Sequence, residues 1–150
     1  MRDEADVRSN AKTLAQFKKS VSFVKTELAG HGNDESEFYV DVQGNDFERI
    51  VTQDEFEREA IEPLRNRLTK PLEDIFMKEE VTNEGITKDN IDEVLMVGGS
   101  VRIPMVQDIV RQFFPSTTTM NISSYPDECV AHGAAYYAHM IKNTPEEDWL

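Results

Sequence analysis

The sequence predicts an α/β fold in which a helix and a β-hairpin are followed by a second part built around a buried strand. Apolar residues between positions 10 and 29 recur at helical spacing, and residues 38–42 alternate in the period of a half-buried strand. The continuous apolar run 94–97 ends in two glycines, which is typical of a strand buried on both faces. Such strands occur in parallel or mixed sheets. We therefore expect the second part of the chain, like the first, to contain both helices and strands.

The composition is that of a folded domain with an acidic surface. With 150 residues, of which 39% are hydrophobic and 30% charged, the chain is long enough to bury a core. The formal net charge of −13 argues against non-specific binding of nucleic acid or of an anionic membrane. No apolar stretch approaches the roughly 18 residues that span a bilayer. We therefore expect neither nucleic acid nor a membrane as a partner.

The cysteine content bears on the compartment of the protein, and the first residues bear on whether the chain is part of a longer protein. Cys129 is the only cysteine, so no disulfide can form within the chain, and a reducing compartment fits. We expect a cytoplasmic protein, with the lumen of the endoplasmic reticulum as the alternative. The first ten residues carry no signal-peptide pattern and lead directly into a helical one, so we expect a segment of a longer protein.

The first part of the chain predicts a helix and a hairpin. The helix over 10–29 has one apolar stripe and ends at Gly30. The stripe consists of Leu14, Phe17, Val21, Val24 and Leu28. The alternation at 38–42, a turn at 44–46 and a return strand then predict a hairpin over 36–51.

A second helical segment follows the hairpin. Thr52 is expected to cap it, because a threonine side chain can accept a hydrogen bond from the first helical turn and acidic residues follow it. Pro63 and Pro71 each remove a backbone donor from the helix. We expect two helical pieces, with the break near 69–71.

The second part of the chain predicts a loop, a strand and a helix. Residues 80–90 are polar and predict a loop with a short turn at 87–90. The buried strand at 94–97 comes next. Apolar residues at helical spacing over 103–113 then predict an amphipathic helix, which Pro115 stops.

A last helix is expected to begin at the sequence Tyr-Pro-Asp-Glu, residues 125–128, after a stretch rich in serine and threonine. Two acidic residues in its first turn suit the positive end of a helix. Its apolar positions are Val130, Ala134, Ala138 and Ile141. We expect Tyr136 and Tyr137 to pack against the rest of the protein.

The charge is unevenly distributed. Residues 31–93 hold 19 acidic and 7 basic side chains, which account for nearly all of the imbalance. Two local exceptions are the lysine-bearing helix over 10–29 and the segment 94–126, which carries Arg102 and Arg111 against Asp108. These positive patches are either solvated surface or two contacts to one anionic ligand.

The segment LMVGGSVRIP, residues 95–104, is the most informative for chemistry. Glycines after a buried strand let the backbone approach a ligand, and the helix that follows favours negative charge at its start. The pattern is neither a Walker A loop nor GxGxxG, so a tight turn without a ligand stays open. The three histidines do not stand at metal-ligand spacing, and Cys129 has no identifiable partner, so we expect no catalytic or metal centre.

Five segments along the chain form a pattern that is specific in order and spacing. They are DVRSNAKTL, TQDEFE, LTKPLEDIF, IDEVLMVGGSVRIPMVQDIVRQFF and YPDECVAHGAA. With them the chain resembles the second lobe of the nucleotide-binding domain of the seventy-kilodalton heat-shock protein (chaperone) family. The resemblance implies an actin-like ATPase fold of the ribonuclease H-like type. Residues 1–71 would form the outer subdomain of that lobe, 72–142 part of the inner subdomain, and 143–150 a tail leading to the interdomain linker.

The resemblance also implies a nucleotide site. In the family, the glycine turn and the arginine after it hold the adenine base, and a helix lysine contacts the ribose and the base. The matching positions are Gly98, Gly99, Ser100 and Arg102 for the turn, Lys25 for the helix, and Asp127 for the aspartate of the following loop. The implied ligands are ATP and ADP, with magnesium held mainly by the first lobe. A planar guanidinium such as that of Arg102 can stack on a base.

Four positions depart from the family pattern. Ser22, Thr26 and Ala29 stand where the family has Glu, a second base-stacking Arg and Ser, and Tyr125 stands where it has Asn. The loss of one side of the base sandwich removes a contact of about 1 kcal/mol, so we expect weaker or rearranged adenosine binding. The family's first lobe and catalytic groups would lie upstream and its peptide-binding domain downstream. We expect the whole protein to be an ATPase and this segment alone not to hydrolyse ATP.

The resemblance further implies partners. Nucleotide-exchange factors grip the outer subdomain in the family, and J-domain co-chaperones and unfolded client polypeptides would engage the full-length protein, together with the first lobe and the peptide-binding domain in cis. The alternative is a divergent, non-catalytic partner-binding module, because Ser22, Thr26 and Ala29 have replaced nucleotide contacts.

Overall fold

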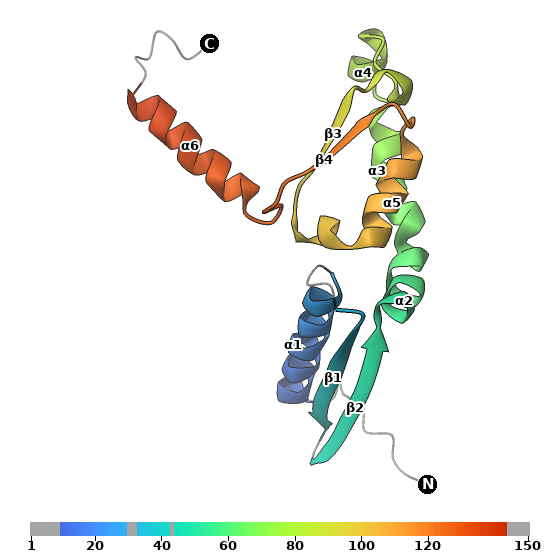
Figure 1. The fold of residues 1–150 in the computed structure, drawn as a ribbon, viewed down its shortest axis with the longest axis vertical. Coiled ribbons are helices and arrows are strands. Elements are labelled where there is room, and N and C mark those ends of the chain that lie inside the picture. Colours follow the sequence, from blue (N-terminus) through green and yellow to red (C-terminus); the bar gives the residue numbers. More distant parts are fainter. Residues whose placement is uncertain (1–9, 30–32, 43, 144–150) are drawn as a thin grey trace. The chain divides into compact units, whose positions relative to one another are not determined.

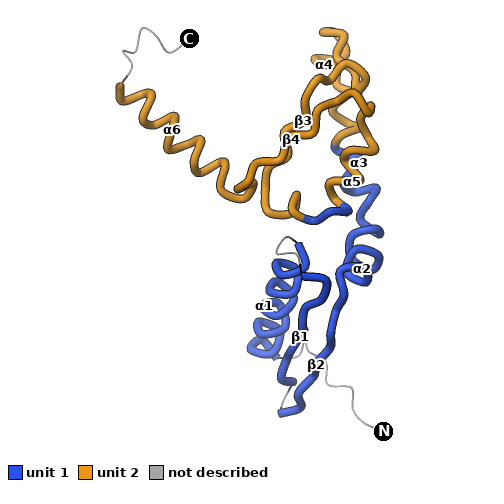
Figure 2. Tube along the Cα trace, viewed as in Figure 1, with its two compact units in different colours: residues 1–71, 103–105 blue, residues 72–102, 106–150 orange. Residues whose placement is uncertain are grey.

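The computed structural model of the chain describes residues 10–29, 33–42 and 44–143, which form a mixed α/β structure (Figure 1). It divides into two compact units (Figure 2). Unit 1 comprises residues 1–71 with 103–105, and unit 2 comprises 72–102 with 106–150. The predicted α/β class is confirmed. The assignment of the two parts as outer and inner subdomains stays a prediction, and most of the predicted tail lies outside the described residues.

Helix α1, Ala11–Leu28, begins unit 1 as predicted. The side chain of Asn10 accepts hydrogen bonds from the amides of Lys12, at 2.9 Å, and Thr13, at 3.3 Å, and so satisfies two of the first amides of the helix. The predicted end at Gly30 lies outside the described residues.

The apolar stripe of α1 is displaced from the predicted one. Val24 and Leu28 are buried as predicted, but Val21 is 44% exposed and Thr13 is buried instead. At 100° per residue, Val21 and Thr13 lie at opposite margins of the stripe. The hairpin therefore covers the margin of the helix that carries Thr13 and leaves the other uncovered.

Strands β1, Glu35–Val42, and β2, Asn45–Thr52, form the predicted antiparallel hairpin. Val42 lies opposite Asn45, and Gly44, in the turn between them, has a φ of +83°, which favours glycine. The predicted turn at 44–46 is corrected, because Asn45 and Asp46 already belong to β2. Alternate residues of β1 are buried, as the sequence predicts for a half-buried strand. Strand β2 is almost wholly exposed, so the hairpin has one covered strand.

The core of unit 1 lies between α1 and β1. Val24, Leu28, Phe38 and Val40 form its buried cluster. Partly buried side chains from α1, both strands and the following helix pack against it, namely Phe17, Val42, Val51 and Phe56. The ring of Phe38 meets that of Phe17 edge-on, with centroids 5.3 Å apart.

The helical segment after the hairpin begins as predicted. Helix α2, Gln53–Phe56, is capped by Thr52, whose hydroxyl accepts a hydrogen bond from the amide of Glu55 at 3.2 Å. The predicted break near 69–71 is wrong. The helix instead changes its hydrogen-bond spacing over 57–64 and resumes as α3, Arg65–Ile75.

The two prolines explain the position of this break. A π turn, Glu57–Ile61, and a 3₁₀ turn, Glu62–Leu64, surround Pro63, so no bond of the helix needs its missing amide. Pro71 lies inside α3 without ending it. It removes one bond, to the carbonyl of Arg67, and that residue is exposed, so water can bond to the carbonyl instead.

Unit 2 begins with more structure than the polar loop predicted at 80–90. A short helix, α4, spans Glu79–Asn83, which corrects that prediction in part. The predicted short turn at 87–90 is confirmed as a 3₁₀ turn at Lys88–Asn90. The amide of Thr87 donates to the side chain of Asn90 at 2.8 Å, within a reciprocal capping box.

A parallel two-stranded sheet lies at the centre of unit 2. Strand β3, Glu93–Met96, pairs with β4, Thr119–Ile122, and helix α5, Pro104–Phe113, connects them. The parallel sheet and α5 are confirmed predictions, but β4 was missed, because its serine- and threonine-rich surroundings hide the alternation of Met120 and Ile122. The prediction that the 94–97 strand is buried on both faces is wrong for Leu95, which is 62% exposed, and for Val97, which follows the strand and is 41% exposed. Among the described residues of unit 2, no helix or strand covers the face on which Leu95 lies.

Helix α6, Cys129–Asn143, begins later than predicted. Residues 125–128 form a turn before it, so the two acidic residues expected in its first turn, Asp127 and Glu128, precede the helix. The predicted packing of Tyr136 and Tyr137 is wrong, since these side chains are 68% and 63% exposed. None of the residues of α6 is buried. Its apolar residues occur on several sides of the helix, and the described residues of unit 2 do not cover them.

Candidate functional site

Most of the predicted site residues lie just beyond the carboxyl ends of β3 and β4. Strand β3 ends at Met96 and leads into the glycine turn, and β4 ends at Ile122 and leads into the loop that carries Asp127. Because the strands are parallel, both segments leave the sheet at the same edge. Ligands of open α/β sheets bind outside this edge.

Gly98 ties the two segments together. Its amide donates a hydrogen bond to the carbonyl of Pro126 at 2.7 Å, and Pro126 is fully buried. Gly98 has a φ of +102°, which side chains rarely adopt, although a Cβ there would meet no atom within 4 Å. Glycine is therefore required here by backbone conformation, and the space in front of the turn is open.

Replacing Gly98 with alanine is expected to destabilise unit 2 by about 1–3 kcal/mol, because the methyl group makes the positive φ unfavourable. Thermal unfolding followed by circular dichroism measures the effect. The control is Gly133→Ala in α6, where a Cβ meets nothing and helix propensity favours alanine. Equal stability of the Gly98→Ala variant and the unsubstituted protein would contradict this account of the turn.

Arg102 and Asp127 form an ion pair across the two segments, with 2.6 Å between a terminal guanidinium nitrogen and a carboxylate oxygen. Arg102 ends the 3₁₀ turn Gly99–Arg102, in which Val101 is buried. The Arg102 and Asp127 side chains are 35% and 49% exposed. The hydrogen bond from Arg102, with one from its own amide, lowers the pKa of Asp127 below its ordinary value.

Of the six residues that the sequence predicts for one site, five lie in unit 2. Gly98, Gly99, Ser100 and Arg102 lie in one turn, and a Cβ on Gly99 would lie 3.8 Å from that of Asp127. The sixth, Lys25, is an exposed residue of α1 and belongs to unit 1.

The positions that depart from the family pattern form local contacts. The hydroxyl of Thr26 donates to the carbonyl of Ser22 at 2.9 Å within α1, and Ala29 is buried. Tyr125 is 58% exposed, and its ring centroid lies 6.4 Å from that of His132. His132 lies 3.6 Å from the carboxylate of Glu128.

The remaining titratable groups form no metal centre among the residues that the structure describes, which contain no cluster of three or more metal-binding side chains. The thiol of Cys129 is half-buried and donates to the carbonyl of Pro126 at 3.2 Å. Over the same residues, no helix combines the length and apolar character that crossing a membrane requires.

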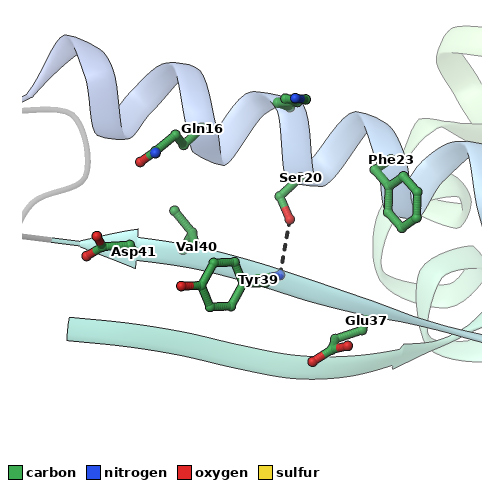
Figure 3. Close-up of a pocket in the computed structure, with 8 residues that line it drawn as sticks. Gln16, Ser20, Phe23, Glu37, Tyr39, Val40 and Asp41 are labelled. Atoms are coloured by element: carbon green, nitrogen blue, oxygen red, sulfur yellow. Dashed lines mark hydrogen bonds between the residues drawn. The ribbon is translucent and has the colours of Figure 1, made fainter. Parts of the chain in front are cut away.

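A groove between α1 and β1 in unit 1 was not found from the sequence (Figure 3). It has a volume of about 440 Å³. It is lined by Gln16, Lys19, Ser20, Phe23, Glu37, Tyr39, Val40 and Asp41. Its residues on α1 are Gln16, Lys19, Ser20 and Phe23. They recur at helical spacing outside the apolar stripe, and this spacing is the signal in the sequence for a second face of the helix.

Side chains at the edge of β1 define the groove. Ser20 points from α1 toward β1, where its hydroxyl accepts a hydrogen bond from the amide of Tyr39 at 3.1 Å (Figure 3). The Tyr39 hydroxyl donates to Asp46 at 2.7 Å, and this bond raises the pKa of Tyr39. Phe23 and Tyr39 are 57% and 46% exposed, so aromatic surface lies beside acidic Glu37 and Asp41.

Comparison with known proteins identifies the family. A family model described as Hsp70 protein matches residues 1–149. The chain is 33% identical over 138 residues to heat shock 70 kDa protein 14 of Mus musculus and 31% identical to that of Bos taurus, covering 91% of this chain and 25% of each relative. It is 38% identical over 92 residues to a heat shock protein 70 homolog of Acanthamoeba polyphaga mimivirus, covering 57% of this chain and 9% of the relative. The chain thus spans about a quarter of the mouse and bovine proteins. Because the family model covers almost every residue, the chain belongs to the Hsp70 family.

Proposed function

We propose that this chain is part of the ATP-binding domain of an Hsp70-type chaperone and supplies the adenosine-facing side of the nucleotide site. Family membership supports an actin-like ATPase fold, with which the α/β structure and its small sheets agree. In this proposal the chain is the second lobe, with residues 1–71 as its outer subdomain and 72–142 as part of its inner subdomain.

One observation carries the proposal, namely that two loops after parallel strands converge on an open glycine turn beside an arginine. A Cβ at Gly98 would meet no atom within 4 Å, so space lies open beside the turn, and Arg102 presents a planar cation at the same edge. A planar guanidinium stacks on an aromatic base in a way that lysine cannot. The residues present therefore fit an adenine base.

Other parts of the proposal rest on the family resemblance. Lys25 is proposed to contact the ribose and the base from α1. Magnesium and the hydrolytic groups are proposed to be supplied mainly by the first lobe of the longer protein. Since Thr26 stands where the family has a second stacking arginine, the adenosine contact is proposed to be weak in this member and to depend on Arg102.

Replacing Arg102 with alanine in the full-length protein is expected to weaken ADP binding about fivefold, the equivalent of roughly 1 kcal/mol for a lost cation–π contact. Isothermal titration calorimetry measures the dissociation constant. Arg111→Ala is the matched control, because Arg111 is an exposed arginine of α5 that pairs with Asp108 at 3.1 Å. The absence of binding by the unsubstituted protein at millimolar ADP or ATP would reject the nucleotide function.

The groove between α1 and β1 favours a second candidate, a module that binds protein partners. Exposed aromatic surface lies beside Glu37 and Asp41, against which the lining sets one basic residue, Lys19, and this balance suits a partner with basic side chains. We propose that a nucleotide-exchange factor docks here on the outer subdomain. J-domain co-chaperones and unfolded clients are proposed partners of the full-length protein.

Replacing Glu37 with lysine is expected to weaken binding of a purified Hsp70 exchange factor about tenfold at low salt, because it reverses a charge in the groove. Surface plasmon resonance at two salt concentrations measures the change, which should shrink at high salt. Glu73→Lys on α3 is the control, since it makes the same charge change in unit 2 on an exposed helix. Equal effects of the two variants would contradict docking in the groove. Partner binding without any adenine-nucleotide binding would favour the non-catalytic module.

A further inference from the structure

We propose that Asp127 acts as a positioning residue: it holds the guanidinium of Arg102 in place for the base and does not itself bind the nucleotide. This inference rests on the proposed nucleotide function and assigns a role within that site. It starts from the ion pair, in which the Asp127 carboxylate bonds one terminal nitrogen of Arg102 at 2.6 Å. With one nitrogen held, the long arginine side chain keeps a restricted set of orientations.

The aspartate is itself held in place by its loop. Pro126, next to it, is buried and accepts the amide of Gly98 at 2.7 Å. The carbonyl of Tyr125 accepts the amides of Glu128 at 3.1 Å and Cys129 at 3.0 Å, which closes the turn around Asp127. The carboxylate is therefore attached to a backbone that hydrogen bonds hold in place. The Arg102 side chain is 35% exposed, and without this carboxylate it would move more freely.

The charge of Asp127 is matched by that of Arg102. A carboxylate paired with this guanidinium is neutralised, so it can orient the arginine without adding net negative charge to the site. Arg102 is the charged side chain that lowers the pKa of Asp127, and the other donor is the amide of Asp127 itself. Since Thr26 has replaced the second stacking arginine, base contact depends on one guanidinium and hence on what orients it.

The experiment compares two ligands that differ only in the base, ADP and ribose 5-diphosphate, bound to the full-length protein. Asp127→Asn is expected to weaken ADP binding by no more than the roughly fivefold loss of Arg102→Ala and to leave ribose 5-diphosphate binding unchanged. In the Arg102→Ala background, Asp127→Asn is expected to add no further loss, because its effect passes through Arg102. Glu128→Gln, which removes the adjacent exposed carboxylate, is the matched control and should change neither ligand.

The outcomes separate the inference from the function. Additive losses from Asp127→Asn and Arg102→Ala, or an equal loss of both ligands, would overturn the positioning role while nucleotide binding stands. A full-length protein that binds neither ADP nor ATP at millimolar concentration would reject the proposed function itself.

Discussion

Replacing Phe38 with alanine is expected to destabilise unit 1 by about 3–5 kcal/mol, the usual cost of removing a buried aromatic ring. Phe38 is 9% exposed and belongs to the cluster that joins β1 to α1. Its ring also packs edge-on against Phe17, at 5.3 Å, and Phe47, at 6.2 Å. The neighbours on a two-stranded hairpin can collapse only in part into the space that the ring leaves, so most of the loss should be observed.

Urea denaturation followed by circular dichroism measures this loss. The control is Phe23→Ala on α1, because Phe23 is the same residue type in the same unit but is 57% exposed. That variant is expected to change the free energy of unfolding by no more than about 0.5 kcal/mol. If the two variants lose the same stability, Phe38 does not hold the hairpin on the helix.

Replacing Ile109 with alanine is expected to destabilise unit 2 by about 2–5 kcal/mol. Ile109 lies on α5 and is 1% exposed. Other apolar residues buried in this unit are Met96, Val101, Val106 and Pro126. Helix α5 follows the glycine turn directly, so weaker anchoring of the helix should also loosen the turn. We therefore expect Ile109→Ala to weaken ADP binding as well as to lower the free energy of unfolding.

The matched control is Ile75→Ala, because Ile75 ends α3 in the same unit and is 46% exposed. Urea denaturation compares the two variants, and calorimetry with ADP at a temperature where both are folded tests the effect on the site. If Ile109→Ala retains the stability of the unsubstituted protein, the buried side of α5 does not support unit 2.

Periodicity made much of unit 1 predictable. Helix α1 and the hairpin each carry a strong local pattern with a local signal at one end, Asn10 for the helix and Gly44 for the hairpin. The cap at Thr52 was predictable for the same reason, since its hydrogen bond joins residues three apart. Local patterns did not show that Val21 would be exposed, because its burial depends on where the hairpin covers the helix.

Unit 2 was less predictable, because its strands are short and its pairing is non-local. The four residues of β4 alternate too briefly to stand out, and they become a strand by pairing with β3, more than 20 residues away. The exposure of Leu95 and Tyr136 likewise follows from how many strands and helices cover them. A pattern of apolar residues predicts burial only when another element covers them.

The sequence by itself determined the mixed α/β class, the hairpin, helices α1 and α5, and the family, and it predicted the nucleotide contacts. These depend on residue type and on spacing along the chain, which local hydrogen bonds and side-chain periodicity translate directly into structure. Only the tertiary structure decided that Arg102 pairs with Asp127, that the helix changes its spacing around Pro63, and that a groove lies between α1 and β1. The ion pair joins residues 25 positions apart that meet because two parallel strands end at one edge, and no spacing along the chain encodes such a meeting.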